Sequence, residues 1–212
     1  MKVSTKRKKD KLIQVFTRTP TEGMVKTRLI PTLGARKSAK LHQRMTAHAI
    51  SISRLTSADI EIYVTPDATH HFFSCFKADG KLKTQVGESL DDRMGDALES
   101  GLERYQKVVL LGCDCPTINT ATMHEAFSQL EQFENIFIPV EDGGFSLIGT
   151  TKFSNTIFEN VIWGSDVVMK QIRVNLEKYN YSWNELDTLW DVDDINDYHR
   201  LSALMPQLTN DL

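Results

Sequence analysis

A short apolar segment, Val108–Leu111, is followed closely by Gly112, Asp114 and Pro116. An unbroken apolar run is typical of a strand buried on both faces of a parallel sheet, although so short a run also occurs in buried helices. Because Pro116 cannot continue a helix or a sheet ladder and Gly112 permits a tight exit, the pattern favours a strand. We expect Asp114 at the carboxyl end of this central strand, where open α/β sheets bind ligands. Taken alone, an aspartate there is more often a turn or cap residue than a metal ligand.

The composition is that of an ordinary globular protein. Its 212 residues are enough for one domain with a full core. The formal net charge of −3 gives no general electrostatic reason to bind nucleic acid or an anionic membrane. No apolar run approaches the roughly 20 residues that cross a bilayer, and the start of the chain lacks the apolar middle of a secretion signal. We expect a cytoplasmic protein with no nucleic-acid partner and no membrane insertion.

The cysteines and the first residues add two expectations. Cys75, Cys113 and Cys115 form no paired framework, which suits a reducing compartment. Cys113 and Cys115 resemble a soft-metal pair, but with no further cysteine or histidine in that segment we do not expect a metal there. Residues 1–11 are rich in lysine and arginine and bury little, so we predict a flexible basic tail at 1–11 and a single domain at 12–212.

Alternating strand and helix patterns occupy the predicted domain. Ile60, Ile62 and Val64 alternate as in a strand, and apolar residues spaced by three and four between 41 and 55 form a helical stripe. On that stripe His48 is expected to be a hydrogen-bonded core residue. Further strands are predicted at 12–16, 82–86 and 135–139, and further helices at 90–102, 123–130 and 167–176. Candidate caps are a Thr122/Glu125 capping box and Ser165. This alternation predicts an α/β fold with a mostly parallel sheet.

The loop after the first strand carries three cations. Arg18, Lys26 and Arg28 follow the predicted strand at 12–16, and Gly23 helps to shape the loop. Arginine matches phosphate oxygens with two donors and lysine acts as a mobile point charge, so the cluster suits a pyrophosphate. The glycine and lysine spacings of a Walker loop and of a dinucleotide fingerprint are absent. The alternative is an exposed basic loop without a ligand.

Carboxylates and an arginine complete the candidate site. Asp142 precedes Gly143 and Gly144, which is the pattern of a backbone that approaches a ligand but also of an ordinary hairpin turn. Arg93 near a helix start is either a ligand group or the partner of Asp91 or Asp92 in a surface salt bridge. Four aspartates crowd a strand-to-helix junction, and some of them must be helix caps: Asp191, Asp193, Asp194 and Asp197. In an extended stretch Asp191 and Asp193 point to the same side, so each is either a cap or a ligand for an oxygen-coordinated divalent cation.

These blocks resemble a known family. The segments Phe16–Leu29, Gly112–Pro116, Asp142–Gly149 and Asp191–Asp193 are similar to those of a bacterial transferase family associated with radical-enzyme and arsenosugar gene clusters. That family lies within the nucleotide-diphospho-sugar transferase (GT-A) superfamily. The resemblance implies a three-layer α/β/α Rossmann-like fold with a mixed sheet, a nucleotide-activated donor and a divalent cation, Mg²⁺ or Mn²⁺. It also implies that Asp114 stands where superfamily members hold the metal that bridges the donor phosphates.

The chain departs from the family pattern at three places. Cys113 replaces the usual serine, Phe145 and Ser146 replace two tyrosines, and Gly164 replaces a serine after Trp163. A small residue for a small one at 113 changes little. The loss of two tyrosine hydroxyls changes the expected acceptor contacts, so the identity of the acceptor stays open.

The resemblance leads to a functional hypothesis. We expect transfer of a glycosyl group from a nucleotide-diphosphate sugar to a small-molecule acceptor, with Asp114 and one of Asp191 or Asp193 holding the cation. Lys26, Arg18 and Arg28 would stabilise the negative charge of the leaving diphosphate. Asp142 would orient or deprotonate the acceptor. A nucleotidyltransferase that releases pyrophosphate is the alternative, and a protein that only binds nucleotides is the third possibility. The oligomeric state stays open.

Overall fold

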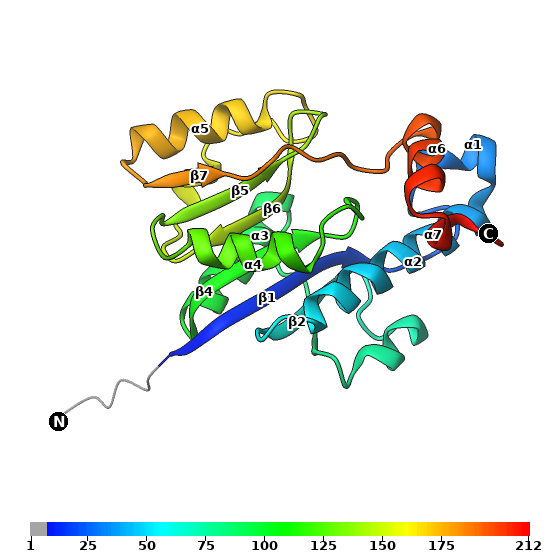
Figure 1. Ribbon diagram of the computed structural model, residues 1–212, viewed down its shortest axis with the longest axis horizontal. Helices are drawn as coiled ribbons and strands as arrows, with labels where there is room; N and C mark the ends of the chain where they lie inside the picture. Colours follow the sequence, from blue (N-terminus) through cyan, green and yellow to red (C-terminus); the bar gives the residue numbers. More distant parts are fainter. Residues whose placement is uncertain (1–7) are drawn as a thin grey trace.

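The computed structural model describes residues 8–212, and these form one mixed α/β sheet protein (Figure 1). Seven strands follow the order β3-β2-β1-β4-β6-β5-β7. Only β6 runs antiparallel to its neighbours, β4 and β5, and the other pairings are parallel. The strands are β1 (Lys9–Arg18), β2 (Asp59–Thr65), β3 (Lys81–Thr84), β4 (Tyr105–Gly112), β5 (Asn135–Pro139), β6 (Phe145–Thr150) and β7 (Trp183–Glu185).

Helices connect the strands. The α-helices are α1 (Ile30–Leu33), α2 (Ala35–Arg54), α3 (Leu90–Leu102), α4 (Thr120–Gln129), α5 (Val168–Lys178), α6 (Ile195–Leu204) and α7 (Pro206–Thr209). Three short 3₁₀ segments are η1 (Thr27–Leu29), η2 (His71–Phe76) and η3 (Asn155–Phe158). Within the described residues, none of the helices combines the length and apolar character needed to cross a membrane. The predicted cytoplasmic location stays a prediction.

The two central strands explain the unbroken apolar run of the sequence. β1 and β4 lie next to each other in the middle of the sheet, and the side chains of Val108 and Val109 are both fully buried although they point to opposite faces. β1 begins at Lys9, so the part of the predicted basic tail that reaches Lys11 is wrong. The reason is strand pairing, because Lys9 and Lys11 lie in register with residues of β4. Residues 1–7 of that predicted tail lie outside the described residues.

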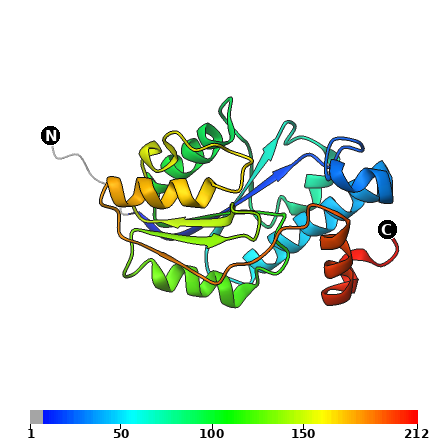
Figure 2. The ribbon, with the colours of Figure 1, turned by 90° about the horizontal axis from the view of Figure 1, so that it is seen from above.

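Two helical layers cover the sheet, as Figure 2 shows. On one face α2 and α4 pack against side chains such as Ile13 and Val15 of β1, with Phe127 of α4 in the same cluster. On the other face α3 and α5 pack against Leu12 and Phe16 of the same strand. Alternating residues of β1 thus serve two cores, which confirms the predicted three-layer α/β/α arrangement.

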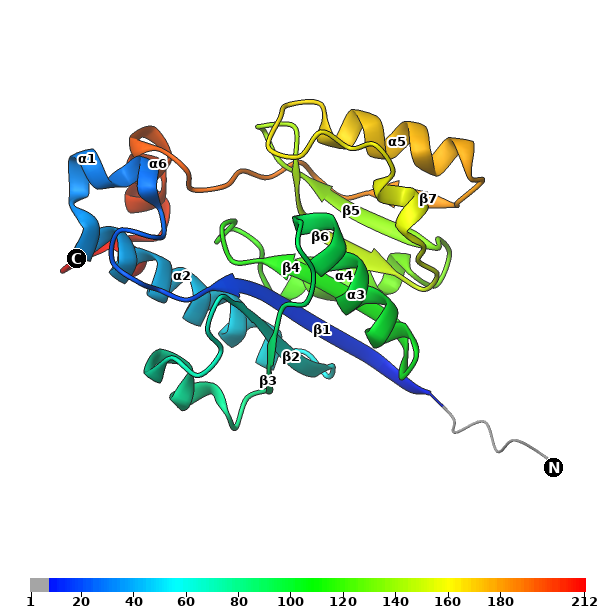
Figure 3. The ribbon, with the colours of Figure 1, turned by 180° about the vertical axis from the view of Figure 1, so that it is seen from behind.

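A third apolar cluster lies beyond the carboxyl ends of the central strands. The chain leaves β7, crosses toward α2 and ends in α6 and α7 beside α1 (Figures 1 and 3). Trp190, Val192 and Leu201 are buried there against Leu41 and Met45 of α2. This contact holds the segment with the four aspartates at the ligand-binding edge of the sheet, far in sequence from β1 and β4.

Three local expectations need correction. Helix α4 begins at Thr120, and its N-cap is Asn119, whose side chain accepts a hydrogen bond from the Thr122 backbone N–H at 3.0 Å. Thr122 therefore lies inside the first turn and does not begin a capping box. The Ser165 hydroxyl donates to the Ile162 carbonyl at 2.6 Å instead of capping α5. The apolar stripe of α2 stops before Leu55, which is 71% exposed.

His48 behaves as predicted. Its Nε2 lies 3.0 Å from the carbonyl oxygen of Pro116, which ties α2 to the segment after β4. Burial lowers the pKa of its imidazole despite that hydrogen bond. The histidine is thus a hydrogen-bonded packing residue.

Candidate active site

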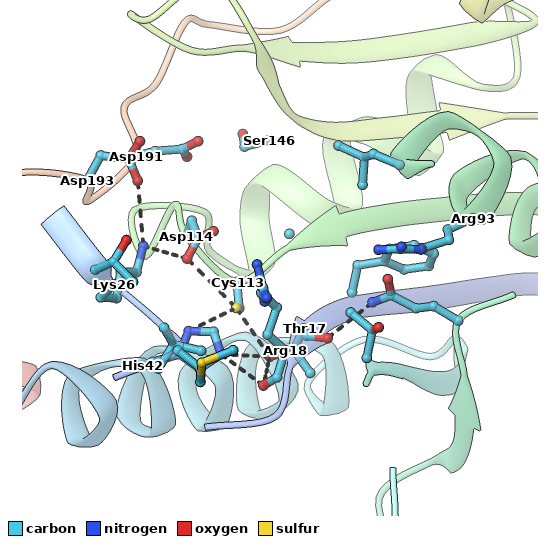
Figure 4. A pocket seen from close by; sticks show the side chains of 18 of the residues that line it. Thr17, Arg18, Lys26, His42, Arg93, Cys113, Asp114, Ser146, Asp191 and Asp193 are labelled. Atoms are coloured by element: carbon cyan, nitrogen blue, oxygen red, sulfur yellow. Dashed lines mark hydrogen bonds and ion pairs between the residues drawn. The ribbon is translucent and has the colours of Figure 1, made fainter. Parts of the chain in front are cut away.

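A cavity of about 930 Å³ opens where β1 and β4 end. Its walls come from the basic loop, the segment after β4, the start of α3, the start of β6 and the crossing segment before α6. Figure 4 shows its labelled side chains converging from these elements. The predicted site residues that line it are Arg18, Gly23, Lys26, Arg28, Arg93, Asp114, Asp191 and Asp193. Segments that are distant in sequence are therefore brought to one edge of the sheet.

Lys26 is the hub of the polar contacts in this cavity. Its backbone has φ +47° and ψ +45°, a left-handed conformation that turns the loop into η1. The side chain is only 5% exposed, and its ammonium lies 2.5 Å from Asp114 Oδ1 and 3.9 Å from Asp193 Oδ1. It also donates to the carbonyl of Val192 at 2.7 Å. One buried cation thus joins the basic loop, the β4 end and the crossing segment (Figure 4).

This ion pair keeps both groups charged. Burial disfavours the ammonium, but the Asp114 carboxylate outweighs it and raises the pKa of Lys26. Burial likewise opposes ionisation of Asp114, yet the nearby charge of Lys26 holds the pKa of that carboxyl below its usual value. Asp114 is therefore an ionised acceptor at neutral pH, as a metal or phosphate-bridging role requires.

The crossing segment presents two aspartates on one side. Val192 donates its backbone N–H to the Asp114 carbonyl at 2.9 Å, and its side chain is fully buried. Because side chains alternate in extended backbone, Asp191 and Asp193 both point away from Val192 and lie above Asp114 and Lys26 (Figure 4). Their placement agrees with the predicted common side.

Asp191 and Asp193 differ in their partners. Asp191 Oδ1 is buried and has no hydrogen-bond partner among the described residues. Burial and the negative charge of Asp114 raise the pKa of Asp191 to about 8. Burial also raises the pKa of Asp193, but that carboxylate accepts from the Arg28 guanidinium at 3.1 Å. Asp191 is thus the carboxyl group with an unfilled acceptor.

The other two aspartates of this segment are helix caps. Asp194 is the N-cap of α6 and accepts from the backbone N–H groups of Asn196 and Asp197 at 2.8 and 3.1 Å. Asp197 accepts in return from the Asp194 N–H at 2.9 Å, which completes a capping box. The four aspartates therefore fall into two pairs. Asp194 and Asp197 cap the helix, whereas Asp191 and Asp193 face the cavity.

Arg93 lines the cavity without the expected surface salt bridge. Its guanidinium donates to the carbonyl oxygens of Gly87 and Glu88 at 3.0 and 2.9 Å, and no ion pair joins it to Asp91 or Asp92 within the described residues. Asp92 instead closes a capping box with Ser89 at the start of α3. Arg93 is held by backbone and keeps its positive charge available to an anion.

The Asp142–Gly144 turn lies outside the lining of the cavity. Asp142 Oδ1 accepts from the Gly144 N–H at 2.9 Å, so the carboxylate shapes its own turn. Gly143 has φ +88°, and a Cβ atom on it would lie 2.1 Å from the Asp166 carbonyl oxygen. Glycine is thus required at 143 by the backbone of Asp166. The predicted roles of Asp142, Gly143 and Gly144 toward a ligand stay predictions.

Sequence reasoning missed a second group of polar residues beneath Asp114. His42 of α2, Thr17 of β1 and Cys113 are each 4% exposed and contact one another (Figure 4). The Thr17 hydroxyl lies 3.3 Å from His42 Nε2, and the Cys113 thiol lies 3.4 Å from the Thr17 hydroxyl. The available signal was a four-residue spacing of uncharged polar residues and a histidine beside the apolar stripe of α2: Ser38, His42 and Thr46.

Solved structures share this architecture. A protein from Desulfovibrio desulfuricans G20, provisionally named a nucleotide-diphospho-sugar transferase, is 26% identical and has a TM-score of 0.84, with 96% of this chain and 89% of that chain covered. The CMP:2-keto-3-deoxy-manno-octonic acid synthetase complexed with CTP is 10% identical with a TM-score of 0.58, covering 93% and 99%. Rv0371C of Mycobacterium tuberculosis H37Rv complexed with manganese is 18% identical with a TM-score of 0.52, covering 92% and 98%.

The structural likenesses establish the nucleotide-diphospho-sugar transferase fold that the resemblance implied. The association with radical-enzyme and arsenosugar gene clusters stays a prediction. No curated protein matches the sequence. One family model covers residues 42–165, more than half of the chain. The chain therefore belongs to the family described as uncharacterized protein conserved in bacteria (DUF2064).

Proposed function

We propose that this protein transfers a glycosyl group from a nucleotide-diphosphate sugar to a small-molecule acceptor. The observation that carries the proposal is the oxygen of Asp191 that has no partner in the described part of the chain, beside the Lys26–Asp114 ion pair in a cavity otherwise rich in cationic side chains. Such an arrangement of carboxylates and cations suits a diphosphate with a bridging divalent ion. The fold, and the provisional name of the Desulfovibrio desulfuricans protein, support a nucleotide-activated donor.

The carboxylates fit Mg²⁺ or Mn²⁺. All candidate ligands offer oxygen, which these hard cations prefer, and the buried Asp191 Oδ1 accepts no hydrogen bond from residues 8–212. Asp114 and Asp191 would hold the cation, while Asp193 keeps Arg28 and Lys26 in place. When bound, the cation would neutralise charge that develops on the leaving diphosphate.

Cationic side chains of the protein would also neutralise the charge on the leaving diphosphate. Lys26 and Arg93 line different parts of the cavity wall, and Arg18 lies between them in Figure 4. Together with Arg28 they would bind the diphosphate and stabilise it as the glycosidic bond breaks. Gly23, with φ +82°, allows the loop that carries these residues to turn. Lys26 has a second task, because it holds Asp114 in the ionised form.

The acceptor would approach from the side of the Asp142 turn. Asp142 is exposed and uses Oδ1 for the Gly144 N–H, so its other oxygen is available to orient or deprotonate an acceptor hydroxyl. Gly143 and Gly144 would set the position of that carboxylate through the turn. Phe145 and Ser146 line the cavity next to this turn, where they would contact the acceptor.

Nucleotidyl transfer is the second candidate. The likeness to a synthetase complexed with CTP favours it, because a triphosphate would meet the same cations and carboxylates. The two reactions differ in the bond that breaks. Attack on the α-phosphorus releases pyrophosphate, whereas glycosyl transfer releases a nucleoside diphosphate.

A thermal-shift panel tests the proposal. Nucleoside diphosphates, nucleotide sugars and nucleoside triphosphates are each added with and without Mn²⁺ to the wild type and to Asp114→Asn. Metal-dependent stabilisation by one diphosphate and its sugar, lost in the variant, would support glycosyl transfer and identify the base. A preference for a triphosphate would favour nucleotidyl transfer. If no nucleotide raises the melting temperature, the donor-site assignment is wrong.

A further inference from the structure

We propose that His42, Cys113 and Asp114 form a binding site for a borderline-soft divalent cation, Zn²⁺, in the wall of the cavity. Among residues 8–212 these three are the group whose ligand atoms all lie within 4.8 Å of one another. Cys113 Sγ is 4.0 Å from His42 Nδ1 and 4.0 Å from Asp114 Oδ1. Tetrahedral Zn²⁺ with its ordinary bond lengths separates such ligand atoms by about 3.5 Å. The two pairs that include the sulfur therefore need to close by about half an ångström, and the histidine and aspartate atoms, which lie within 4.8 Å of each other, by at most about 1.4 Å.

The histidine is already oriented as a metal ligand. His42 Nε2 lies 3.0 Å from the carbonyl oxygen of Arg18. A carbonyl only accepts hydrogen bonds, so Nε2 carries the proton in the neutral ring and the lone pair of Nδ1 points toward Cys113. Histidines that bind metals commonly donate their other N–H to a backbone carbonyl in this way, which fixes the tautomer and the ring orientation. The packing of α2 against β1 thus prepares the imidazole in advance.

The site is reachable from solution. His42, Cys113 and Asp114 all line the cavity, although the first two are only 4% exposed. Three protein ligands facing a cavity leave a fourth coordination position for water. Cys115 is excluded from this set, because its sulfur contacts the Thr117 hydroxyl at 3.4 Å and it does not line the cavity. The ligands are therefore one cysteine with His42, and not the Cys113–Cys115 pair of the sequence.

The ligand chemistry separates this site from the proposed magnesium or manganese site. A thiolate and an imidazole select Zn²⁺ and related ions, whereas an all-carboxylate set selects hard ions. Binding would release the Cys113 thiol proton to solvent. Asp114 Oδ1 belongs to both sites and now contacts the Lys26 ammonium at 2.5 Å. Zn²⁺ must therefore compete with Lys26 for that oxygen.

Cobalt absorption tests the site directly. Co²⁺ is titrated into metal-free, reduced wild type, Cys113→Ser and Cys115→Ser, and Zn²⁺ affinity is then measured by competition with a chromophoric chelator. We expect thiolate-to-cobalt charge-transfer absorption in the wild type and in Cys115→Ser, and none in Cys113→Ser. Zn²⁺ affinity should fall at least about tenfold in Cys113→Ser and in His42→Gln. Absence of the band in wild type, or its persistence in Cys113→Ser, would overturn the proposal.

A variant of Lys26 gives a more specific test, because for it the proposal predicts a higher Zn²⁺ affinity. Lys26→Met removes the competing ammonium, so its Zn²⁺ affinity should rise by a measurable factor, on the order of threefold to tenfold. A fall in affinity would show that the cation does not bind at Asp114 Oδ1. Serine is close in size to cysteine, and thermal unfolding of each metal-free variant confirms that the fold persists before the titrations are compared.

One consequence rests on the proposed function. If the cavity binds a nucleotide with Mn²⁺, Zn²⁺ at His42 and Cys113 should abolish that stabilisation in the wild type but not in Cys113→Ser. A normal cobalt band in a protein that binds no nucleotide would leave the zinc site intact and reject the proposed function. A nucleotide-binding protein without the band would reject the zinc site alone.

Discussion

The charged side chains around Glu61 and those around Asp114 each include a buried member, and the charge balance of the two groups differs. In the amino half of β2, the Glu61 carboxylate is 2% exposed and accepts from the Arg104 guanidinium at 2.7 and 3.0 Å. The Lys83 ammonium lies 3.0 Å from the same carboxylate. Although burial disfavours the charge, Arg104 and Lys83 hold the pKa of Glu61 below its usual value. One carboxylate here has two cations.

At the carboxyl ends of the strands the balance is reversed. Asp114, Asp191 and Asp193 share the buried Lys26 and the exposed Arg28, and one buried oxygen of Asp191 has no partner among the described residues. A satisfied network stabilises a fold, whereas an excess of partly buried carboxylates costs stability, and such violations are expected at functional sites. We therefore interpret the Glu61 network as structural and the Asp114 cluster as the proposed binding site.

The largest effect should come from Asp114→Asn. The variant loses the charge that Lys26 stabilises and that a divalent cation would need, so transfer should slow by at least about 100-fold. The measurement is release of nucleoside diphosphate from the donor identified by the thermal-shift panel. Glu61→Gln is the control, and it should keep wild-type turnover at temperatures where it is folded. Wild-type turnover in Asp114→Asn would contradict the interpretation of the Asp114 cluster as the site of transfer.

The structural half predicts that Glu61→Gln lowers the free energy of unfolding by about 2 kcal/mol at pH 7. The loss stays moderate because Arg104 and Lys83 are 35% and 30% exposed and can be hydrated. Urea unfolding measures it. Glu61 stabilises the fold above its ordinary pKa and loses that contribution as pH falls through the lowered folded value, so the difference should shrink in acid.

A matched pair controls this measurement. Glu185 accepts from the Arg173 guanidinium at 2.7 and 2.9 Å, which is nearly the geometry of Glu61 with Arg104, but its side chain is 23% exposed. Glu185→Gln should therefore cost about 1 kcal/mol or less. Equal losses in the two variants would show that burial does not distinguish the networks.

The sequence was a good guide to the fold because its signals there are local. The apolar run at Val108–Leu111 and the proline after it are sufficient to predict the central strand, and the topology rule then places Asp114 at the ligand edge. Lys9 was assigned to the tail because its place in β1 depends on pairing with Tyr105, a contact far away in sequence. Composition carries no record of such pairing.

The site was predictable only in part, for a related reason. Asp114 comes just after β4 and Lys26 lies in the loop that follows the neighbouring strand β1, so the topology brings both to the same edge of the sheet. Asp191 and Asp193 could not be assigned as ligands or caps, because that depends on the residue at which α6 begins. His42 was missed because its partners, Thr17, Cys113 and the Arg18 carbonyl, lie far from it in the sequence and are identified only by folding.

Asp191→Asn should raise the free energy of unfolding, whereas Glu61→Gln should lower it. The folded pKa of Asp191 is about 8 and its ordinary value is 3.8, so the native state binds the extra proton between them and loses stability as pH rises through that window. Without divalent cations, the variant should be more stable than the wild type by about 1–2 kcal/mol at pH 8.5. Urea unfolding at pH 4.5, about 6.5 and 8.5 should show the gain growing with pH. Destabilisation at every pH would contradict the excess of carboxylate.

The smallest effect on stability should come from Arg28→Gln. Arg28 is 74% exposed, so its contact with Asp193 is worth about 0.5 kcal/mol or less and should vanish at about 1 M salt. Arg200→Gln is the control for nucleotide binding, because Arg200 contacts Glu141 at 2.9 Å, is 43% exposed and does not line the cavity. Arg28→Gln should unfold much like the wild type, and Arg200→Gln should lose up to about 1 kcal/mol because its guanidinium also lies 4.3 Å from the Trp190 ring centroid. Only Arg28→Gln should weaken stabilisation by the nucleotide. Equal nucleotide binding in the two variants would show that Arg28 does not belong to the diphosphate site. Lys26 would then remain as the buried cation that distinguishes the Asp114 cluster from the Glu61 network.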